Sequence, residues 1–238
     1  MENATYAALT RQSGLMNELR VIANNIANAS TTGYRGEEVM FSEFIADLGP
    51  RQESLSMAAA RVRQTDLTQG GLTQTGGSFD LAIEGEGYFL VEDAAGPLMT
   101  RAGSFTPDAN GDLVTMDGRR VLDAGGAPVF VPPDAGRIGI APDGTISANG
   151  DPIGQIGLVV PDDPLAMTRV GGTLFNPNGG FAPAEGGRML QGFLEDSNVN
   201  PIAQISRMIE VQRAYELGQK FLDQEDERIR GLIQAAVR

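Results

Sequence analysis

The sequence predicts an α+β protein. An antiparallel, β-rich middle is flanked by one long helix at each end of the chain, and we expect the two helices to pair as a coiled coil. Apolar residues recur at helical spacing in residues 1–30 and again in residues 201–238, and short strand-like runs separated by turns lie between them. Four segments follow from this pattern: an N-terminal helix over 1–33, an extended connector over 34–78, a β-rich domain over 79–196 and a C-terminal helix over 197–238.

The first helix is expected to begin near Asn3 or Thr5, either of which can cap it. It is expected to give way around residues 28–33, where Ser, Thr and Asn compete with the helical backbone for hydrogen bonds and Gly33 can adopt the left-handed stop conformation. The apolar stripe of this helix consists of Leu15, Leu19, Ile22 and Ile26.

The C-terminal helix has clear start signals, with Asn200 as the cap and Pro201 at the first helical position. Its main stripe consists of Met208, Val211, Tyr215, Leu222, Ile229, Leu232 and Ala236. A continuous helix of this length spans roughly 50 Å at 1.5 Å per residue. Since it outgrows a small middle domain, part of its stripe must meet another helix or stay bare.

Residues 34–75 give weaker signals. Phe41, Phe44, Ile45 and Leu48 suggest a short helix that Gly49-Pro50 would end. Residues 51–75 contain few large apolar side chains, and composition fits an extended connector and a disordered linker equally well.

Strand signals begin at Phe79, where Phe79, Leu81 and Ile83 alternate with more polar or smaller residues. Turn dipeptides then recur at Asn110-Gly111, Asp117-Gly118, Asp143-Gly144, Asn149-Gly150 and Asn178-Gly179. Such pairs supply the two positive-φ residues of a tight hairpin. Short strands at this spacing predict an antiparallel sandwich or barrel.

The charge of the chain restricts the kinds of partner that we expect. The net charge of −13 makes a nucleic-acid partner unexpected. Of the 18 basic and 31 acidic residues, nine and eleven lie in residues 1–45 and 201–238, which leaves nine basic and twenty acidic residues in 46–200. The nearly balanced ends can pack against copies of themselves, whereas the acidic middle favours solubility.

Cys and His are both absent, so the sequence predicts no disulfide, no thiolate metal site and no histidine base. No cofactor, metal site or catalytic residue is expected. No apolar run is long enough to span a bilayer, and the N-terminus lacks the features of a secretory signal.

Two acidic patterns are candidates for a chemical role. Residues 108–112 (DANGD) begin like a calcium loop, but the Gly and the closing Glu are not where such a loop needs them, so a hairpin turn is favoured. A carboxylate hydrolase using Asp143 or Asp162 requires these acids to converge in a deep pocket. A carbohydrate-binding β module with helical arms requires exposed aromatic residues aligned on one face.

Four motifs in order resemble the bacterial flagellar rod and hook protein family. Residues 22–35 (IANNIANASTTGYR) resemble its N-terminal signature, and residues 197–201 (SNVNP) with 208–215 (MIEVQRAY) resemble its C-terminal signature. Residues 80–89 (DLAIEGEGYF) and 100–106 (TRAGSFT) are similar to its shared β domain. Within the family, the length, the opening residues 1–4 and residues 222–229 are most similar to a proximal-rod member, with a distal-rod or hook-type member as the alternative.

The resemblance implies a structural subunit of the proximal rod, the drive shaft that crosses the periplasm and transmits torque. It implies export through the flagellar type III apparatus without a cleaved signal, and partners that are other rod proteins and copies of the same chain. The terminal helices would then pair in the inner wall of the tube and would be frayed or disordered before assembly. The expected assembly interface is Leu15, Leu19, Ile22, Asn25, Ile26, Met208, Val211, Tyr215, Leu222, Ile229 and Leu232.

Overall fold

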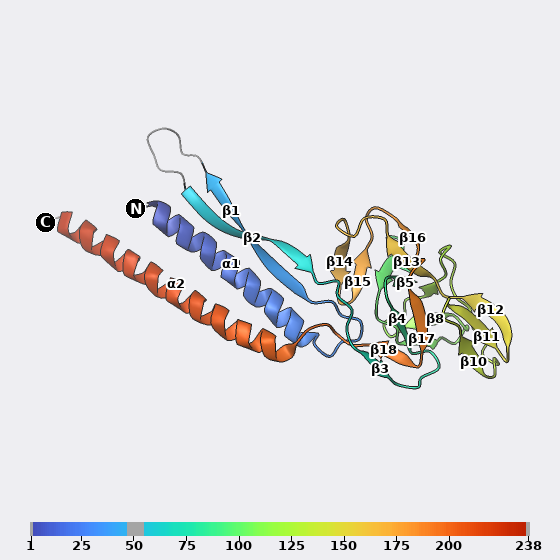
Figure 1. The fold of residues 1–238 in the computed structure, drawn as a ribbon. Coiled ribbons are helices and arrows are strands. Elements are labelled where there is room, and N and C mark those ends of the chain that lie inside the picture. Colours follow the sequence, from blue (N-terminus) through green and yellow to red (C-terminus); the bar gives the residue numbers. More distant parts are fainter. Residues whose placement is uncertain (1, 47–54, 237–238) are drawn as a thin grey trace. The chain divides into compact units, whose positions relative to one another are not determined.

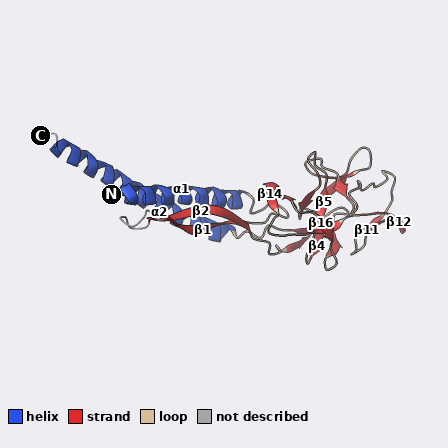
Figure 2. Cartoon of the chain, turned by 90° about the horizontal axis from the view of Figure 1, so that it is seen from above, coloured by secondary structure: helices blue, strands red, loops and turns tan. Residues whose placement is uncertain are grey.

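The computed structural model describes residues 2–46 and 55–236, and the chain within these ranges forms two compact units. Unit 1 comprises the described parts of residues 1–29, 36–67 and 199–238, and unit 2 comprises residues 30–35 and 68–198. Unit 1 contains both long helices and one hairpin, whereas unit 2 contains strands and loops (Figure 2). The described part of residues 36–67 of the expected connector is thus grouped with the helices, whereas residues 34–35 and 68–78 belong to unit 2.

Unit 1 is built from α1 (Glu2–Ala27), α2 (Pro201–Ala236), β1 (Glu37–Ala46) and β2 (Leu55–Thr65). The two strands pair antiparallel from Glu37 opposite Thr65 to Ala46 opposite Leu55, with a register shift after Met40. Helix α1 contacts both the hairpin and α2, and lies between them (Figure 1).

The strand β1 corrects the short helix expected from Phe41, Phe44 and Ile45, while Leu48, Gly49 and Pro50 lie outside the described residues. Four apolar residues in eight positions fit either period, and aromatic and β-branched residues favour strands. Pairing with β2 makes this segment a strand. The sequence did not predict that pairing, because residues 57–60 of β2 are rich in Ala and carry no clear strand signal.

The other strands lie in unit 2, and every strand pair described there is antiparallel. A seven-stranded sheet has the order β14-β15-β6-β5-β13-β16, with β9 pairing β5, and smaller sheets are β10-β11-β12, β17-β4, β18-β3 and β7-β8. The strands are β3 (Leu72–Gln74), β4 (Leu81–Glu84), β5 (Tyr88–Val91), β6 (Leu98–Thr100), β7 (Phe105–Pro107), β8 (Leu113–Thr115), β9 (Val121–Leu122), β10 (Ile138–Ile140), β11 (Thr145–Ala148), β12 (Asp151–Gln155), β13 (Leu158–Pro161), β14 (Thr168–Gly171), β15 (Leu174–Asn176), β16 (Phe181–Pro183), β17 (Arg188–Gln191) and β18 (Phe193–Glu195). The predicted α+β class with an antiparallel, β-rich middle is confirmed.

The expectation of two positive-φ residues per turn is confirmed at Asn149-Gly150, which joins β11 to β12 with φ values of 54° and 102°. At Asn110-Gly111, Asp117-Gly118 and Asp143-Gly144 the glycine alone has a positive φ, so these turns are not of the predicted type. Their first residues instead belong to longer loops. The sequence pair marks the turn correctly but does not fix its length.

Candidate assembly surface

Helices α1 and α2 run antiparallel in unit 1 and pack through their predicted stripes. Leu15, Ile22 and Val211 are buried together, and further stripe residues pack partly buried around them: Leu19, Ile26, Met208, Ala214 and Tyr215. Burying a large apolar side chain stabilises by roughly 1.5–3 kcal/mol. The two ends of one chain therefore cover much of each other's apolar surface.

Two polar contacts fix the register of the helix pair. The Gln12 side-chain amide donates to the carbonyl of Tyr215 at 2.9 Å, and Arg207 donates to the Glu18 carboxylate at 2.7 Å. The hydrogen bond that Arg207 donates to the Glu18 carboxylate raises the pKa of the Arg207 guanidinium above its ordinary value. The Oε1 atom of Gln12 and the Oε2 atom of Glu18 are buried without a hydrogen-bond partner among the described residues.

Asn25 attaches α1 to the hairpin. Its amide nitrogen donates to the Glu37 carbonyl at 2.8 Å, and its side-chain oxygen accepts from the Glu37 amide at 3.0 Å. Asn25 is buried, so both halves of its amide are satisfied inside unit 1. These contacts explain why a polar residue lies beside the apolar stripe. Asn25 makes them within the chain itself.

Helix α2 is longer than its partner. Gln12 lies opposite Tyr215, and the same rise per residue in both helices brings the start of α1 opposite about residue 225 of α2. The last turns of α2 extend past the first residue of α1 (Figures 1 and 2). Ile229, Leu232 and Ile233 lie on these turns and are 42%, 54% and 58% exposed. We call these three residues the overhang stripe.

The predicted interface residues therefore divide into two groups. The nine residues outside the overhang behave as internal contacts or lie at their edge, with Leu222 only half-buried. Ile229 and Leu232 alone among the predicted set are exposed. The apolar stripe of α2 is continuous across both groups. The sequence of α2 therefore does not indicate how far α1 extends along it.

A second apolar row on α2 lies outside the expected assembly interface. Ile202, Ile205 and Ile209 are exposed at spacings of three and four on the side away from α1. Leu217 and Phe221, also exposed, border a groove of about 530 Å³ between the helices, into which the buried Gln12 also faces. The same periodicity that marks the main stripe could have revealed this row.

Two of the acidic residues considered for chemistry, Asp108 and Asp143, are accounted for by local structure. Asp108 accepts hydrogen bonds from the amides of Asn110 and Asp112 at 2.8 and 2.9 Å in the turn between β7 and β8, which confirms the hairpin interpretation. Asp143 is exposed, and hydrogen bonds from Thr145 lower the pKa of its carboxyl. An ionised, turn-capping carboxylate is a poor general acid.

Residues 68–198 also lack the aligned aromatic face of a carbohydrate-binding module, and the described residues lack the acidic cluster of a metal site. Phe130 is the only exposed aromatic residue in residues 68–198, so no aligned aromatic face exists there. Among the described residues, no group of three or more acidic residues could hold a metal ion. None of the described helices is long and apolar enough to cross a membrane.

Three segments match described protein families. Residues 6–35 match the flagella basal body rod protein family, residues 82–148 match the flagellar hook protein FlgE/F/G D1 domain, and residues 190–235 match the flagellar basal body rod FlgEFG protein C-terminal family. These segments contain the four motifs that carried the sequence resemblance, apart from residues 80 and 81 of one motif.

Relatives match over nearly the whole chain. The flagellar basal-body rod protein FlgF of Caulobacter vibrioides is 38% identical, with 98% of each chain covered. FlgF of Mesorhizobium japonicum is 37% identical over 91% of this chain and 90% of the relative. The rod protein FlgG of Bacillus subtilis is 31% identical, with 98% of each chain covered. The chain therefore belongs to the flagellar basal-body rod protein family, and it is a structural subunit of the rod and not an enzyme.

Proposed function

We propose that the chain is a subunit of the proximal rod, the part of the drive shaft that crosses the periplasm and transmits torque. The FlgF relatives support this choice over a distal-rod member, since they match at higher identity than the FlgG relative at similar or slightly lower coverage. They support it over a hook-type member because the FlgE relative of Brucella abortus, although 44% identical, covers 46% of this chain. Its partners are other rod proteins and copies of itself, and it reaches the rod through the flagellar type III export apparatus without a cleaved signal.

The overhang stripe is the observation that carries the proposal. Ile229, Leu232 and Ile233 are exposed, whereas Met208 and Val211, earlier on the same helix, pack against α1. An apolar stripe that continues beyond its internal partner marks a contact with another chain. The groove beside Leu217 and Phe221 offers further apolar surface, and the lone Gln12 oxygen there lacks a donor among the described residues.

In the assembled rod, α1 and α2 form a coiled coil in the inner wall of the tube, and neighbouring subunits cover the overhang stripe. In the free chain, α1 has 26 residues and packs on α2 through three fully buried side chains. In proteins most of the stability of a helix comes from tertiary packing of its apolar face. We therefore expect frayed ends before assembly and firm helices after it.

Ile229→Asp tests the interface without disturbing the fold. Since Ile229 touches no internal cluster, the free energy of unfolding should change by no more than about 0.5 kcal/mol. Motility and incorporation into purified basal bodies should be lost, because an aspartate cannot be buried in an apolar contact. Ile22→Asp is less informative, because it also destroys the internal helix pair.

Gln224→Asp is the matched control, since it adds the same charge to an exposed polar position of the same helix. It should leave motility intact. Normal swimming by the Ile229→Asp strain, or equal loss in the control, would contradict the proposed interface.

A further inference from the structure

The chain passes between the two units four times, at residues 29/30, 35/36, 67/68 and 198/199. These four peptide links are the covalent connections between unit 1 and unit 2. On the unit 2 side, the segments that lead to them are residues 30–35, the start of the stretch at Thr68, and the end of the stretch at Asn198. Force that travels along the chain from one unit to the other enters unit 2 through these segments.

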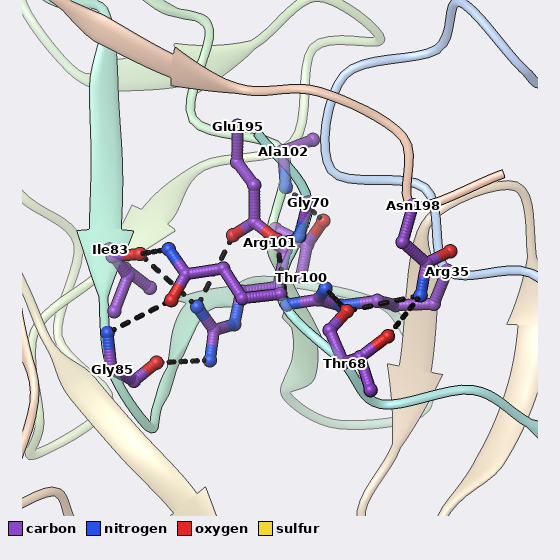
Figure 3. A network of polar contacts seen from close by, with 11 residues as sticks. Arg35, Thr68, Gly70, Ile83, Gly85, Thr100, Arg101, Ala102, Glu195 and Asn198 are labelled. Carbon is purple, nitrogen blue, oxygen red and sulfur yellow. Dashed lines mark hydrogen bonds and ion pairs between the residues drawn. The ribbon is translucent and has the colours of Figure 1, made fainter. Parts of the chain in front are cut away.

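A buried acid joins these segments. Glu195, the last residue of β18, accepts from Arg35 at 2.7 Å and from Arg101 at 3.2 Å (Figure 3). The Gly70 amide donates to the same carboxylate at 3.1 Å. The side chains of Arg35 and Glu195 are each 1% exposed. One carboxylate thus bridges two arginines that are far apart in the sequence.

Backbone hydrogen bonds tie the same segments together. The Gly33 amide donates to the Glu195 carbonyl at 2.7 Å, and the Asn198 amide donates to the Tyr34 carbonyl at 3.3 Å. The Asn198 side chain and the Arg35 guanidinium both donate to the Thr68 carbonyl (Figure 3). Each segment that leads to a link is therefore hydrogen-bonded to another of these segments.

The segment of residues 30–35 has no room to shift. A Cβ at Gly33 would lie 2.3 Å from the Ala102 amide nitrogen, and Gly33 has a φ of 68°. The Arg169 guanidinium stacks on the Tyr34 ring at 4.8 Å and on the Phe175 ring at 4.7 Å. Close packing holds the backbone at Gly33 and Tyr34, and the ion cluster fixes the neighbouring Arg35.

We infer that Glu195, Arg35 and Arg101 form a clamp that gathers the four chain links at one point of unit 2 and shares force among them. The inference rests on the proposed torque-carrying role. Without the carboxylate, two guanidinium groups remain buried without a counter-charge, which is far costlier than losing a surface ion pair. The contacts among Glu195, Arg35 and Arg101 therefore break together or not at all.

Hydrogen exchange of the unmodified full chain across a denaturant series provides the first test. The amides of Gly33, Gly70 and Asn198 should exchange through one shared opening, with the same free energy and denaturant dependence. Separate openings for Gly33 and Asn198 would overturn the clamp. This arm needs no substitution.

Glu195→Gln provides the second test, with Glu92→Gln as the control because Glu92 pairs with Arg120 at the surface. In Glu195→Gln, exchange at Gly33 and Asn198 should accelerate about 100-fold or more. The core amide of Val129, bonded to Val121 at 2.9 Å, should be affected less. Exchange equal to that of the control would overturn the inference.

A charge-free variant covers the case in which Glu195→Gln does not fold. Arg35→Met, Arg101→Met and Glu195→Met together remove every buried charge of the clamp, and such replacements often preserve folding. Val129 should then stay protected while Gly33 and Asn198 exchange faster than in the unmodified chain. Unchanged protection at Gly33 and Asn198 would count against the clamp.

Force is measured directly in an optical trap. Because the chain has no Cys, handles can be attached at Gln224→Cys in unit 1 and Asp151→Cys in unit 2. The first extension should occur at lower force in Glu195→Gln than in Glu92→Gln, and equal forces would refute the inference. Failure here leaves the rod role intact, since that role is tested by assembly of the Ile229 variants.

Discussion

Units 1 and 2 bury apolar side chains in different ways. Unit 2 contains two clusters of thirteen and six buried residues. Among the side chains described in unit 1, one cluster contains three buried residues, and apolar residues of α2 remain at the surface. Unit 2 therefore carries its own core, while unit 1 has apolar surface left for other chains. A subunit that folds in part and completes its packing on assembly needs this division.

The largest effect is expected from the core of unit 2. Phe89 is fully buried and packs edge-on against Phe105 at 5.1 Å between ring centroids. Phe89→Ala should lower the free energy of unfolding of unit 2 by about 3–5 kcal/mol, measured by urea denaturation. The control is Phe130→Ala at an exposed position. Similar losses in both variants would mean that unit 2 lacks the proposed core.

A smaller effect is expected where α1 meets the hairpin. Asn25→Ala leaves the buried amide and carbonyl of Glu37 without their side-chain partner, which should cost about 1–3 kcal/mol in unit 1. Helical circular dichroism during urea denaturation reports this loss. Asn24→Ala removes an exposed amide one position away and should change stability little. Equal effects of the two changes would argue that Asn25 does not attach the hairpin.

The smallest effect is expected at the start of α2. The Asn200 side chain accepts from the amides of Ile202 and Ala203 at 3.0 and 3.1 Å. Asn200→Ala should destabilise unit 1 by about 1 kcal/mol, whereas Asn200→Ser keeps an N-cap and should stay near the unmodified value. A serine variant as weak as the alanine variant would show that the cap is not the cause.

Sequence reasoning succeeded where the cause is local. The cap at Asn200 and the stripe of α2 depend on residues within a few turns of each other, whereas α1 ends at Ala27 and not at Gly33. It failed for β1, because the partner strand lies across the hairpin and has few strand signals. The register of α1 on α2 is likewise a long-range property, so the sequence could not separate Ile229 from Val211.

The clamp was also beyond local patterns. Arg35, Arg101 and Glu195 are separated by 66 and 94 positions, and nothing near any of them identifies its partners. The only available signal was a charged residue inside each of two motifs, with Glu195 just before a third. Charges placed among residues that become buried are expected to be paired, but the pairing itself appears only in the fold.

Labelling of Ile229→Cys tests the central claim most directly, because the natural chain has no other thiol. A maleimide should react readily with the free subunit in dilute solution, where this position is exposed. In purified basal bodies the same thiol should be protected until the rod is denatured, because the proposed interface places it against a neighbouring subunit. Equal reactivity in the free and the assembled protein would contradict the account.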